Sequence, residues 1–204
     1  MSAGLNSSVE PKVVGVINTK AGNLFSLYAC LNRIGYSTVQ INNPQDMVRN
    51  QVDALMVPGQ GRFGQVMKQL VATGLDETIK DWIVADKPFL GICVGLQVLF
   101  KQSEEDPGVA GLGIFEGKVK RLNSPKQPMV GWSKLSSDDE GLNEKIVYFV
   151  NSYGVKQSDV TAATVTYGEQ FIAAINQGNA WAVQFHPEKS GDVGEEVIKQ
   201  CLSY

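Results

Sequence analysis

The chain has 204 residues, of which 43% are apolar and 19% are charged, and its formal net charge is −3. This length and composition suit a single globular domain with a buried core. The slight excess of acidic residues argues against nucleic acid or an anionic membrane as a partner. No apolar run reaches the roughly 18 residues that a membrane-spanning helix needs, so we expect no membrane segment.

The N-terminal segment and the cysteines bear on where the protein works. Residues 1–11 are polar and contain no apolar signal core, so we expect a flexible extension before one domain over 12–204. Cys30, Cys93 and Cys201 are widely spaced and odd in number, which argues against a disulfide framework and fits a reducing cytoplasm. Because there is one histidine and no close cysteine pair, we expect no metal site. Cys30 and Cys201 lie in apolar helical patterns typical of core residues.

Strands and helices alternate in the first half of the sequence. Helices are predicted over 24–34, 65–72 and 75–85, and strands over 12–17, 37–41, 54–57 and 89–92. Asn23 is a suitable cap for the first helix, and Gly35 is a suitable end. This alternation predicts an α/β fold, with a parallel sheet covered by helices on both faces.

Short strand candidates separated by turn residues dominate the second half. They are predicted over 117–122, 129–135, 146–150, 162–167, 171–175 and 181–185, before a final helix over 192–204. Their spacing indicates an antiparallel or mixed extension of the sheet.

A cysteine between two glycines follows the strand predicted at 89–92. The run Gly91-Ile92-Cys93-Val94-Gly95 resembles a nucleophile elbow, where a strand turns sharply into a helix and exposes the side chain at its tip. Glycines suit such a turn because flanking side chains would clash and because unusual backbone angles are accessible without a Cβ. A cysteine packed in a core beneath a helix would fit the same run.

The single histidine lies near the end of the chain. The apolar run 181–185 predicts a strand with His186 at its carboxyl end. Glu188 follows two positions later, so extended backbone would point both side chains to the same side. A cysteine, an imidazole that activates it and a carboxylate that orients the imidazole form a catalytic triad. Cys93, His186 and Glu188 are therefore the predicted catalytic residues.

Residues 59–64 match the G-x-G-x-x-G fingerprint of dinucleotide-binding proteins. Two predicted strands precede this run, whereas the fingerprint normally occupies the first strand–helix turn of its unit. The acidic residue near the expected distance, Asp81, falls inside a predicted helix. We therefore expect no nucleotide cofactor. The backbone N–H groups of Gln60 and Gly61, together with that of Val94, could instead form an oxyanion hole.

Three motifs, in this order, resemble the class I glutamine amidotransferases. They are PGQGRFG at 58–64, GICVGLQVLF at 91–100 and QFHPEKSG at 184–191. The resemblance extends from about residue 12 to the end of the chain and is strongest to the glutaminase subunits of imidazole glycerol phosphate synthases. It implies a flavodoxin-like three-layer fold with a central, mostly parallel sheet, helices on both faces and an antiparallel extension.

The resemblance also implies a reaction and a partner. Cys93 would attack the side-chain amide of glutamine to give a glutamyl thioester and ammonia, His186 would move protons, and Glu188 would orient the imidazole. Water would then release glutamate. Ammonia would pass through a channel to a synthase subunit, a (β/α)8-barrel cyclase that forms a heterodimer with this chain and makes imidazole glycerol phosphate in histidine biosynthesis.

Further positions match residues of that family. Five positions match family residues that line the glutamine pocket: Gly59, Gln97, Glu105, Ser152 and Tyr153. In this comparison Glu105 would hold the amino group of the substrate. The synthase interface is matched by Asn23, Tyr148 and Lys189. Without the resemblance, side chains such as these are more often ordinary surface or core residues.

The sequence departs from the family in four segments. The family patterns DYGxGN, PGVG, PHMGWN and FVHSY correspond here to NTKAGN at 18–23, PGQG at 58–61, PMVGWS at 128–133 and FVNSY at 149–153. Met129 and Asn151 thus replace two family histidines, although the triad is intact. Three alternatives remain: an amidotransferase subunit serving another acceptor such as a nucleotide sugar, a catalytically silent regulatory homologue, and a cysteine hydrolase or peptidase with the same elbow.

Overall fold

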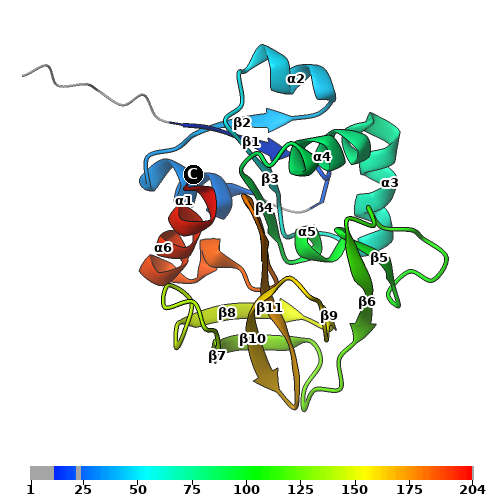
Figure 1. Ribbon diagram of the computed structural model, residues 1–204, viewed down its shortest axis with the longest axis vertical. Helices are drawn as coiled ribbons and strands as arrows, with labels where there is room; N and C mark the ends of the chain where they lie inside the picture. Colours follow the sequence, from blue (N-terminus) through cyan, green and yellow to red (C-terminus); the bar gives the residue numbers. More distant parts are fainter. Residues whose placement is uncertain (1–11, 22–23, 204) are drawn as a thin grey trace, which may run out of the picture.

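The computed structural model describes residues 12–21 and 24–203. Its main sheet contains β1 (Val13–Ile17), β2 (Ser37–Ile41), β3 (Ala54–Val57), β4 (Phe89–Ile92), β10 (Thr161–Tyr167), β11 (Glu169–Gln177) and β12 (Ala180–Val183). The seven strands follow the order β10-β11-β12-β4-β3-β1-β2 (Figure 1). The pairs from β12 to β2 are parallel, and the pairs that join β10 to β11 and β11 to β12 are antiparallel. The predicted parallel sheet with an antiparallel extension is confirmed.

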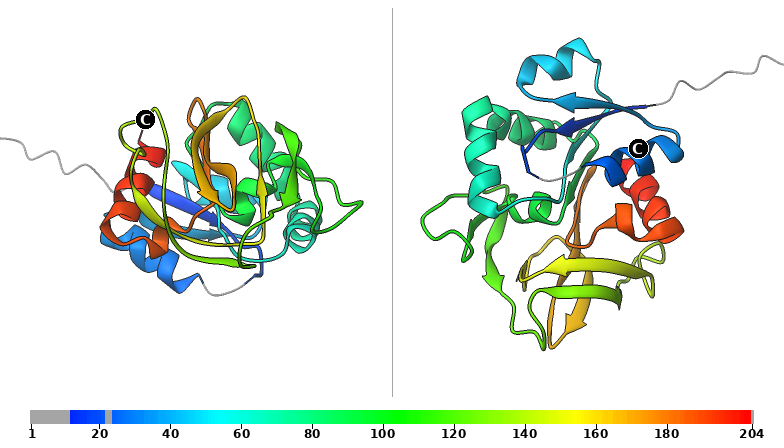
Figure 2. Two further views of the ribbon diagram at one scale, coloured as in Figure 1. Left: turned by 90° about the horizontal axis from the view of Figure 1, so that it is seen from below. Right: turned by 180° about the vertical axis from the view of Figure 1, so that it is seen from behind.

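Helices cover both faces of this sheet (Figures 1 and 2). One face carries α1 (Phe25–Arg33) and α6 (Gly191–Leu202), and the other carries α3 (Phe63–Thr73), α4 (Leu75–Val84) and α5 (Val94–Gln97). Alternate residues of a strand therefore enter different cores: Met56 packs with the α1–α6 layer, and Leu55 packs with the α3–α4 layer. Cys93 belongs to the first of these cores and Val94 to the second.

Two smaller sheets lie beside the main one. One contains β5 (Phe100–Ser103), β6 (Phe115–Arg121) and β9 (Tyr153–Val155), and the other pairs β7 (Met129–Lys134) with β8 (Ile146–Asn151). The expectation that all strands of the second half extend the main sheet is thus wrong for β6, β7 and β8. Phe149 of β8 packs edge-on against Phe171 and Phe185, so one face of β8, which carries Val147 and Phe149, is buried against the main sheet.

Most predicted elements lie within a few residues of the observed ones, and the missed elements are short. They are α2 (Pro44–Arg49), β5, β9 and a 3-10 turn, η1 (Pro187–Lys189). Asn43 caps α2 by accepting a hydrogen bond from the Asp46 N–H. The expected cap of the first helix, Asn23, lies outside the described residues, as do 1–11 and Tyr204.

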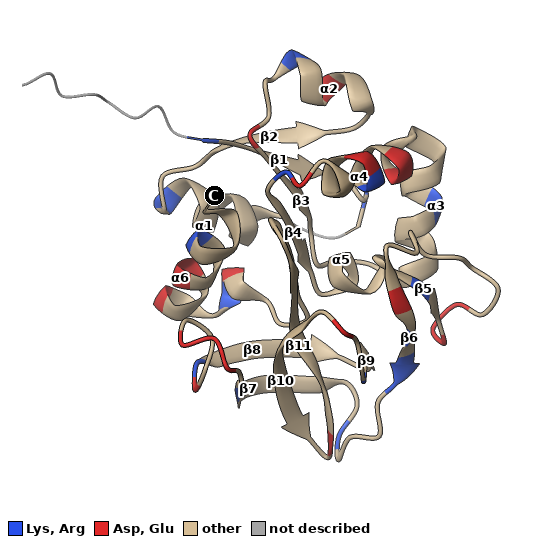
Figure 3. Ribbon diagram, in the orientation of Figure 1, with Lys and Arg blue, Asp and Glu red and all other residues tan. Residues whose placement is uncertain are grey.

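The charged residues avoid the centre of the molecule. They lie on the outer helices, loops and strands, and the central strands β3 and β4 carry none (Figure 3). Within the described part of the chain, no helix combines the length and the apolar character that crossing a membrane requires.

Candidate active site

Cys93 stands between β4 and α5 with a strained backbone. Its φ of 48° and ψ of −105° lie outside the regions that residues with a side chain ordinarily adopt. The flanking glycines are needed for close approach: a Cβ on Gly91 would lie 2.6 Å from the Gly95 carbonyl oxygen, and a Cβ on Gly95 would lie 2.3 Å from the Val57 carbonyl oxygen. The structure therefore has the strand–turn–helix geometry that the sequence predicted.

His186 reaches Cys93 because of the strand order. β12 lies beside β4 and runs parallel to it, so the segments that follow both strands emerge at the same edge of the sheet. The imidazole Nδ1 of His186 is 2.8 Å from Glu188 Oε1, and both side chains are buried. A Cβ on Gly59 would lie 3.0 Å from His186 Cε1 and 3.1 Å from Cys93 Cβ. The three predicted catalytic residues thus lie together, with Gly59 against them.

The environment of His186 favours a protonated imidazole. Burial alone would lower the pKa of His186, but hydrogen bonds to the side chains of Cys93 and Glu188, and their charges, outweigh burial and raise the pKa to about 9. At neutral pH His186 therefore carries a proton beside the sulfur. This is the electrostatic arrangement in which a cysteine reacts as a thiolate.

A cavity of about 230 Å³ opens beside the cysteine. It is lined by Gly61, Cys93, Val94, Gln97, Glu105, Pro128, Val150, Asn151, Ser152 and Tyr153. Most of the predicted pocket residues therefore surround one space, which is suited to a small substrate. Gly59 and Gln60 do not line it, although Gly59 touches the catalytic residues.

Two of the three residues predicted as oxyanion donors, Gly61 and Val94, line this cavity. Gly61 has a φ of +111°, and a Cβ there would lie 2.7 Å from the Cβ of Ala21, so the position suits glycine alone. Val94 begins α5, where the first N–H groups have no partner within the helix. Gln60 lies in the same loop as Gly61, outside the cavity lining.

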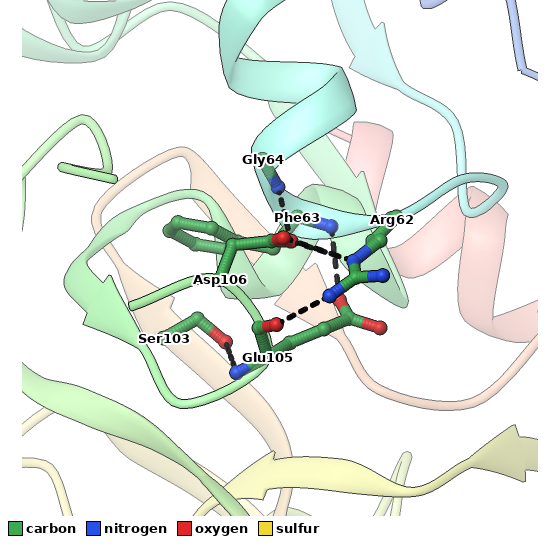
Figure 4. Close-up of polar contacts among 6 residues, drawn as sticks. All are labelled: Arg62, Phe63, Gly64, Ser103, Glu105 and Asp106. Atoms are coloured by element: carbon green, nitrogen blue, oxygen red, sulfur yellow. Dashed lines mark hydrogen bonds and ion pairs between the residues drawn. The ribbon is translucent and has the colours of Figure 1, made fainter. Parts of the chain in front are cut away.

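The loop that follows β5 holds one wall of the cavity in place (Figure 4). Glu105 Oε2 accepts a hydrogen bond of 2.9 Å from the Phe63 N–H, and Asp106 Oδ2 accepts one of 2.8 Å from the Gly64 N–H. Arg62 completes the contact, because its Nε lies 2.9 Å from Asp106 Oδ1 and its Nη2 donates to the Glu105 carbonyl.

These contacts explain the G-x-G-x-x-G run. In a dinucleotide-binding protein the N–H groups at the start of the helix hold a pyrophosphate. Here the first N–H groups of α3, those of Phe63 and Gly64, already bind carboxylates of the chain itself. Among the residues that the structure describes, no group of three His, Cys, Asp or Glu side chains is arranged to hold a metal ion.

Two residues of the site were not among the predicted site residues. Gln184 is fully buried, and its Nε2 lies 3.5 Å from Cys93 Sγ. Asn151 lines the cavity, and its buried Oδ1 has no hydrogen-bond partner in the part of the chain that the structure describes. A polar residue within the apolar run 181–185 was a usable signal for Gln184, and the replaced family histidine was one for Asn151.

The predicted interface residues lie next to the catalytic ones where they are described. The Tyr148 carbonyl accepts a hydrogen bond of 2.8 Å from the His186 N–H, and the Tyr148 ring packs edge-on against Trp132 at 5.6 Å between centroids. Lys189 is exposed in η1. Asn23 lies outside the described residues.

The other two cysteines are core residues, as expected. Cys30 and Cys201 are buried free thiols on α1 and α6. Burial raises the pKa of Cys30 to about 11, and burial also raises the pKa of Cys201. Both are therefore poor nucleophiles at neutral pH.

The structure brings a cysteine, a histidine and a carboxylate together at the strand ends of an α/β sheet. This arrangement is typical of enzymes that act through a cysteine nucleophile. The family model of glutamine amidotransferase class-I matches residues 16–203. The chain belongs to this family, whose members act on glutamine.

Relatives that are 41% identical to the chain include the following two proteins. Imidazole glycerol phosphate synthase subunit HisH of Methanothermobacter thermautotrophicus matches over 93% of this chain and 98% of its own length. The chloroplastic imidazole glycerol phosphate synthase hisHF of Arabidopsis thaliana matches over 96% of this chain and 35% of its own length. The chain therefore spans nearly all of the first relative and about a third of the second.

Solved structures share the fold at lower identity. A glutamine amidotransferase crystal structure superposes with a TM-score of 0.76 at 22% identity, covering 93% of this chain and 96% of that one. The structure of PurLQS from Thermotoga maritima gives a TM-score of 0.70 at 17% identity, covering 94% and 97% of the two chains. These likenesses confirm the predicted class I amidotransferase fold.

Proposed function

We propose that this chain is the glutaminase subunit of an imidazole glycerol phosphate synthase, which hydrolyses glutamine and supplies ammonia to a cyclase subunit. The observation that carries the proposal is Cys93 on its strained elbow, with the buried His186–Glu188 pair beside it and a cavity in front. Membership of the glutamine amidotransferase family supports glutamine as the substrate. The name and length of the Methanothermobacter relative support histidine biosynthesis.

The geometry suits a two-step reaction. The Cys93 thiolate attacks the amide carbon of glutamine, His186 gives its proton to the amide nitrogen, and the C–N bond breaks to release ammonia and leave a glutamyl thioester. Water then gives a proton to His186 and attacks the thioester, and the C–S bond breaks to release glutamate and restore the thiolate. Glu188 holds the imidazole through Nδ1, so Nε2 serves both proton transfers.

The cavity walls supply the binding groups in this proposal. The N–H groups of Gly61 and Val94 stabilise the oxyanion. Glu105 binds the substrate ammonium, and the backbone of Ser152 and Tyr153 lines the rest of the pocket. The buried Asn151 Oδ1, which has no hydrogen-bond partner among residues 12–21 and 24–203, gives the substrate a further acceptor.

Glutamate release tests this function directly. The wild-type chain, alone and with a cyclase subunit of the Methanothermobacter type, is incubated with glutamine. We expect glutamate release that the cyclase increases, and Cys93→Ala should lower it at least a thousandfold, because removing a covalent nucleophile removes the main pathway. Cys30→Ala is the matched control, since it removes a buried thiol away from the cavity and should retain activity. Activity that survives Cys93→Ala would contradict the proposal.

An exposed apolar face next to the site is suited to the cyclase. In the β7–β8 pair, Trp132 lies opposite Tyr148, and Val130 lies opposite Val150. Trp132 and Val130 are 56% and 55% exposed, which is high for large apolar side chains. Val150 on the same face also lines the cavity. We therefore assign this face, which we call the β7–β8 face, to the cyclase barrel in a heterodimer, with the ammonia path beginning at Cys93.

The fused relatives support a partner of this kind. The Arabidopsis protein and the 36% identical hisHF protein of Emericella nidulans are each nearly three times as long as the segment that this chain matches. Their names favour imidazole glycerol phosphate formation over an acceptor such as a nucleotide sugar. The cytoplasmic location, the single domain over 12–204 and the place of Lys189 in the interface remain predictions.

A further inference from the structure

Gln184 is a polar side chain in the most protected part of the site. It follows β12, it is fully buried, and its backbone N–H donates to the Ala173 carbonyl at 2.8 Å. A buried amide is costly unless its polar atoms are hydrogen-bonded. Both of its polar atoms have partners here: Oε1 accepts from Gln97 Nε2 at 3.0 Å, and Nε2 lies 3.5 Å from Cys93 Sγ.

The orientation of these two amides follows from a backbone carbonyl. The Tyr153 oxygen can only accept a hydrogen bond, so the Gln97 group 3.0 Å from it must be the NH₂. The other hydrogen of that NH₂ points to Gln184, which must therefore present its oxygen to Gln97. The NH₂ of Gln184 is left to face the sulfur. These contacts exclude the flipped orientation of the Gln184 amide.

An N–H donor aimed at a sulfur favours the charged form of that sulfur. A thiolate accepts a hydrogen bond much more strongly than a thiol does. The Val150 carbonyl, 3.9 Å from Sγ, can only accept from the neutral thiol, and it lies farther away than Gln184 Nε2. The titratable side chains around Cys93 are those of His186, of Glu188 behind it, and of Glu105 and Tyr153, which line the same cavity.

We propose that Gln184 is a positioning residue that stabilises the Cys93 thiolate through Nε2, and that Gln97 and the Tyr153 carbonyl fix the direction of this hydrogen bond. The inference rests on the proposed role of Cys93 as the nucleophile. It gives Gln97 a second task besides lining the pocket. It also links the segment that carries Ser152 and Tyr153 to the sulfur through two amides.

Alkylation of Cys93 by iodoacetamide across a range of pH tests this role without requiring turnover. Cys93→Ala supplies the background from Cys30 and Cys201. Gln184→Met nearly keeps the shape of the side chain and removes its N–H donor. The alkylation rate at pH 7 should therefore fall about tenfold, and the rate at high pH should approach that of the wild type. In Gln184→Glu the carboxylate still accepts from Gln97 but turns an oxygen towards the sulfur, so the fall at pH 7 should be larger.

The shape of the pH profile separates positioning from a structural effect. A rate lowered by the same factor at every pH, or unchanged in both folded variants, would overturn the proposal. Gln97→Met should lower the rate at pH 7 in the same direction but less, because Gln184 then loses its orienting partner. The two proposals can fail separately. If the alkylation rates of the variants follow the expected pH profiles but the wild-type chain does not hydrolyse glutamine with the cyclase, the proposed function is contradicted and this inference is still supported.

Discussion

His186 is buried and yet holds its proton above neutral pH. Burial opposes the charge, while Cys93 and Glu188 favour it more strongly and raise the pKa to about 9. In an unfolded chain the pKa of histidine is about 6.5. A folded pKa above the unfolded one means that the contribution of His186 to stability is complete below about pH 6.5 and is lost as pH rises through about 9.

We therefore expect the stability difference between the wild-type chain and His186→Gln to depend on pH. The free energy of unfolding of the wild type should exceed that of the variant by most near pH 6, and the difference should shrink steadily towards pH 9.5. Urea unfolding at several pH values measures the difference. The buried thiols of Cys30 and Cys201 titrate in both proteins, so their effects cancel. A difference that stays constant across this range would show that the imidazole charge is not what the site stabilises.

Single residues also show what sequence can and cannot reveal. Cys93, His186 and Glu188 were predictable because their signals are local: glycines beside one residue, and a strand end with a carboxylate two positions later. Gln184 and Asn151 acquire their roles only through burial and through contacts with distant segments. A sequence pattern does not contain the hydrogen bond that joins Gln97 to Gln184 across 87 positions.

At the scale of elements, the elbow depends on one helix, α5, meeting the strands β3 and β4 without side chains between them. α5 begins very close to the end of β3. A Cβ added to Gly95 would lie only 2.3 Å from the Val57 carbonyl oxygen. Helix propensity alone would favour alanine over glycine inside a helix by about 1 kcal/mol. Packing reverses that preference here.

Gly95→Ala should therefore destabilise the fold by about 3 kcal/mol and remove most glutaminase activity, because α5 must move away from β3. Gly108→Ala is a useful comparison. Gly108 has a φ of +88° but no atom within 4 Å of the added Cβ, so only backbone strain of about 1–2 kcal/mol applies. Chemical unfolding of both variants measures the two costs. If Gly95→Ala were no worse than Gly108→Ala, the close approach would not be what the elbow needs.

Elements that depend on contacts between residues close in sequence were predicted better than arrangements that depend on distant contacts. The first half was predicted well because parallel strands and amphipathic helices leave clear periodic signals in β1, α1, β3 and α4. In the second half the longer strands were predicted, but the short strand β9 and the sheets to which the strands belong were not. Whether β8 continues the main sheet or packs on it depends on Phe149 meeting Phe171 and Phe185, and those contacts are distant in sequence.

At the scale of the whole molecule, the β7–β8 pair lies in the lower part of Figure 1 and α4 in the upper part. Trp132→Ala should weaken binding of a cyclase subunit about 30-fold, because a central tryptophan often contributes about 2 kcal/mol to an interface. Val84 is the last residue of α4 and is 85% exposed. Val84→Ala should leave the affinity for the cyclase unchanged. Titration calorimetry with the purified cyclase compares them. Equal affinities for both variants would remove the β7–β8 face from the interface.

The sheet separates two cores, and the elbow is where the chain passes from one to the other. Cys93 packs with the α1–α6 layer and Val94 packs with the α3–α4 layer. The proposed nucleophile and the N–H proposed to stabilise the oxyanion therefore belong to neighbouring residues that pack in opposite layers. Because one peptide bond joins these two residues, any shift of a helical layer against the sheet has to be taken up by the backbone angles of Cys93, which are already strained. A change in the packing of either layer is therefore expected to reach the elbow.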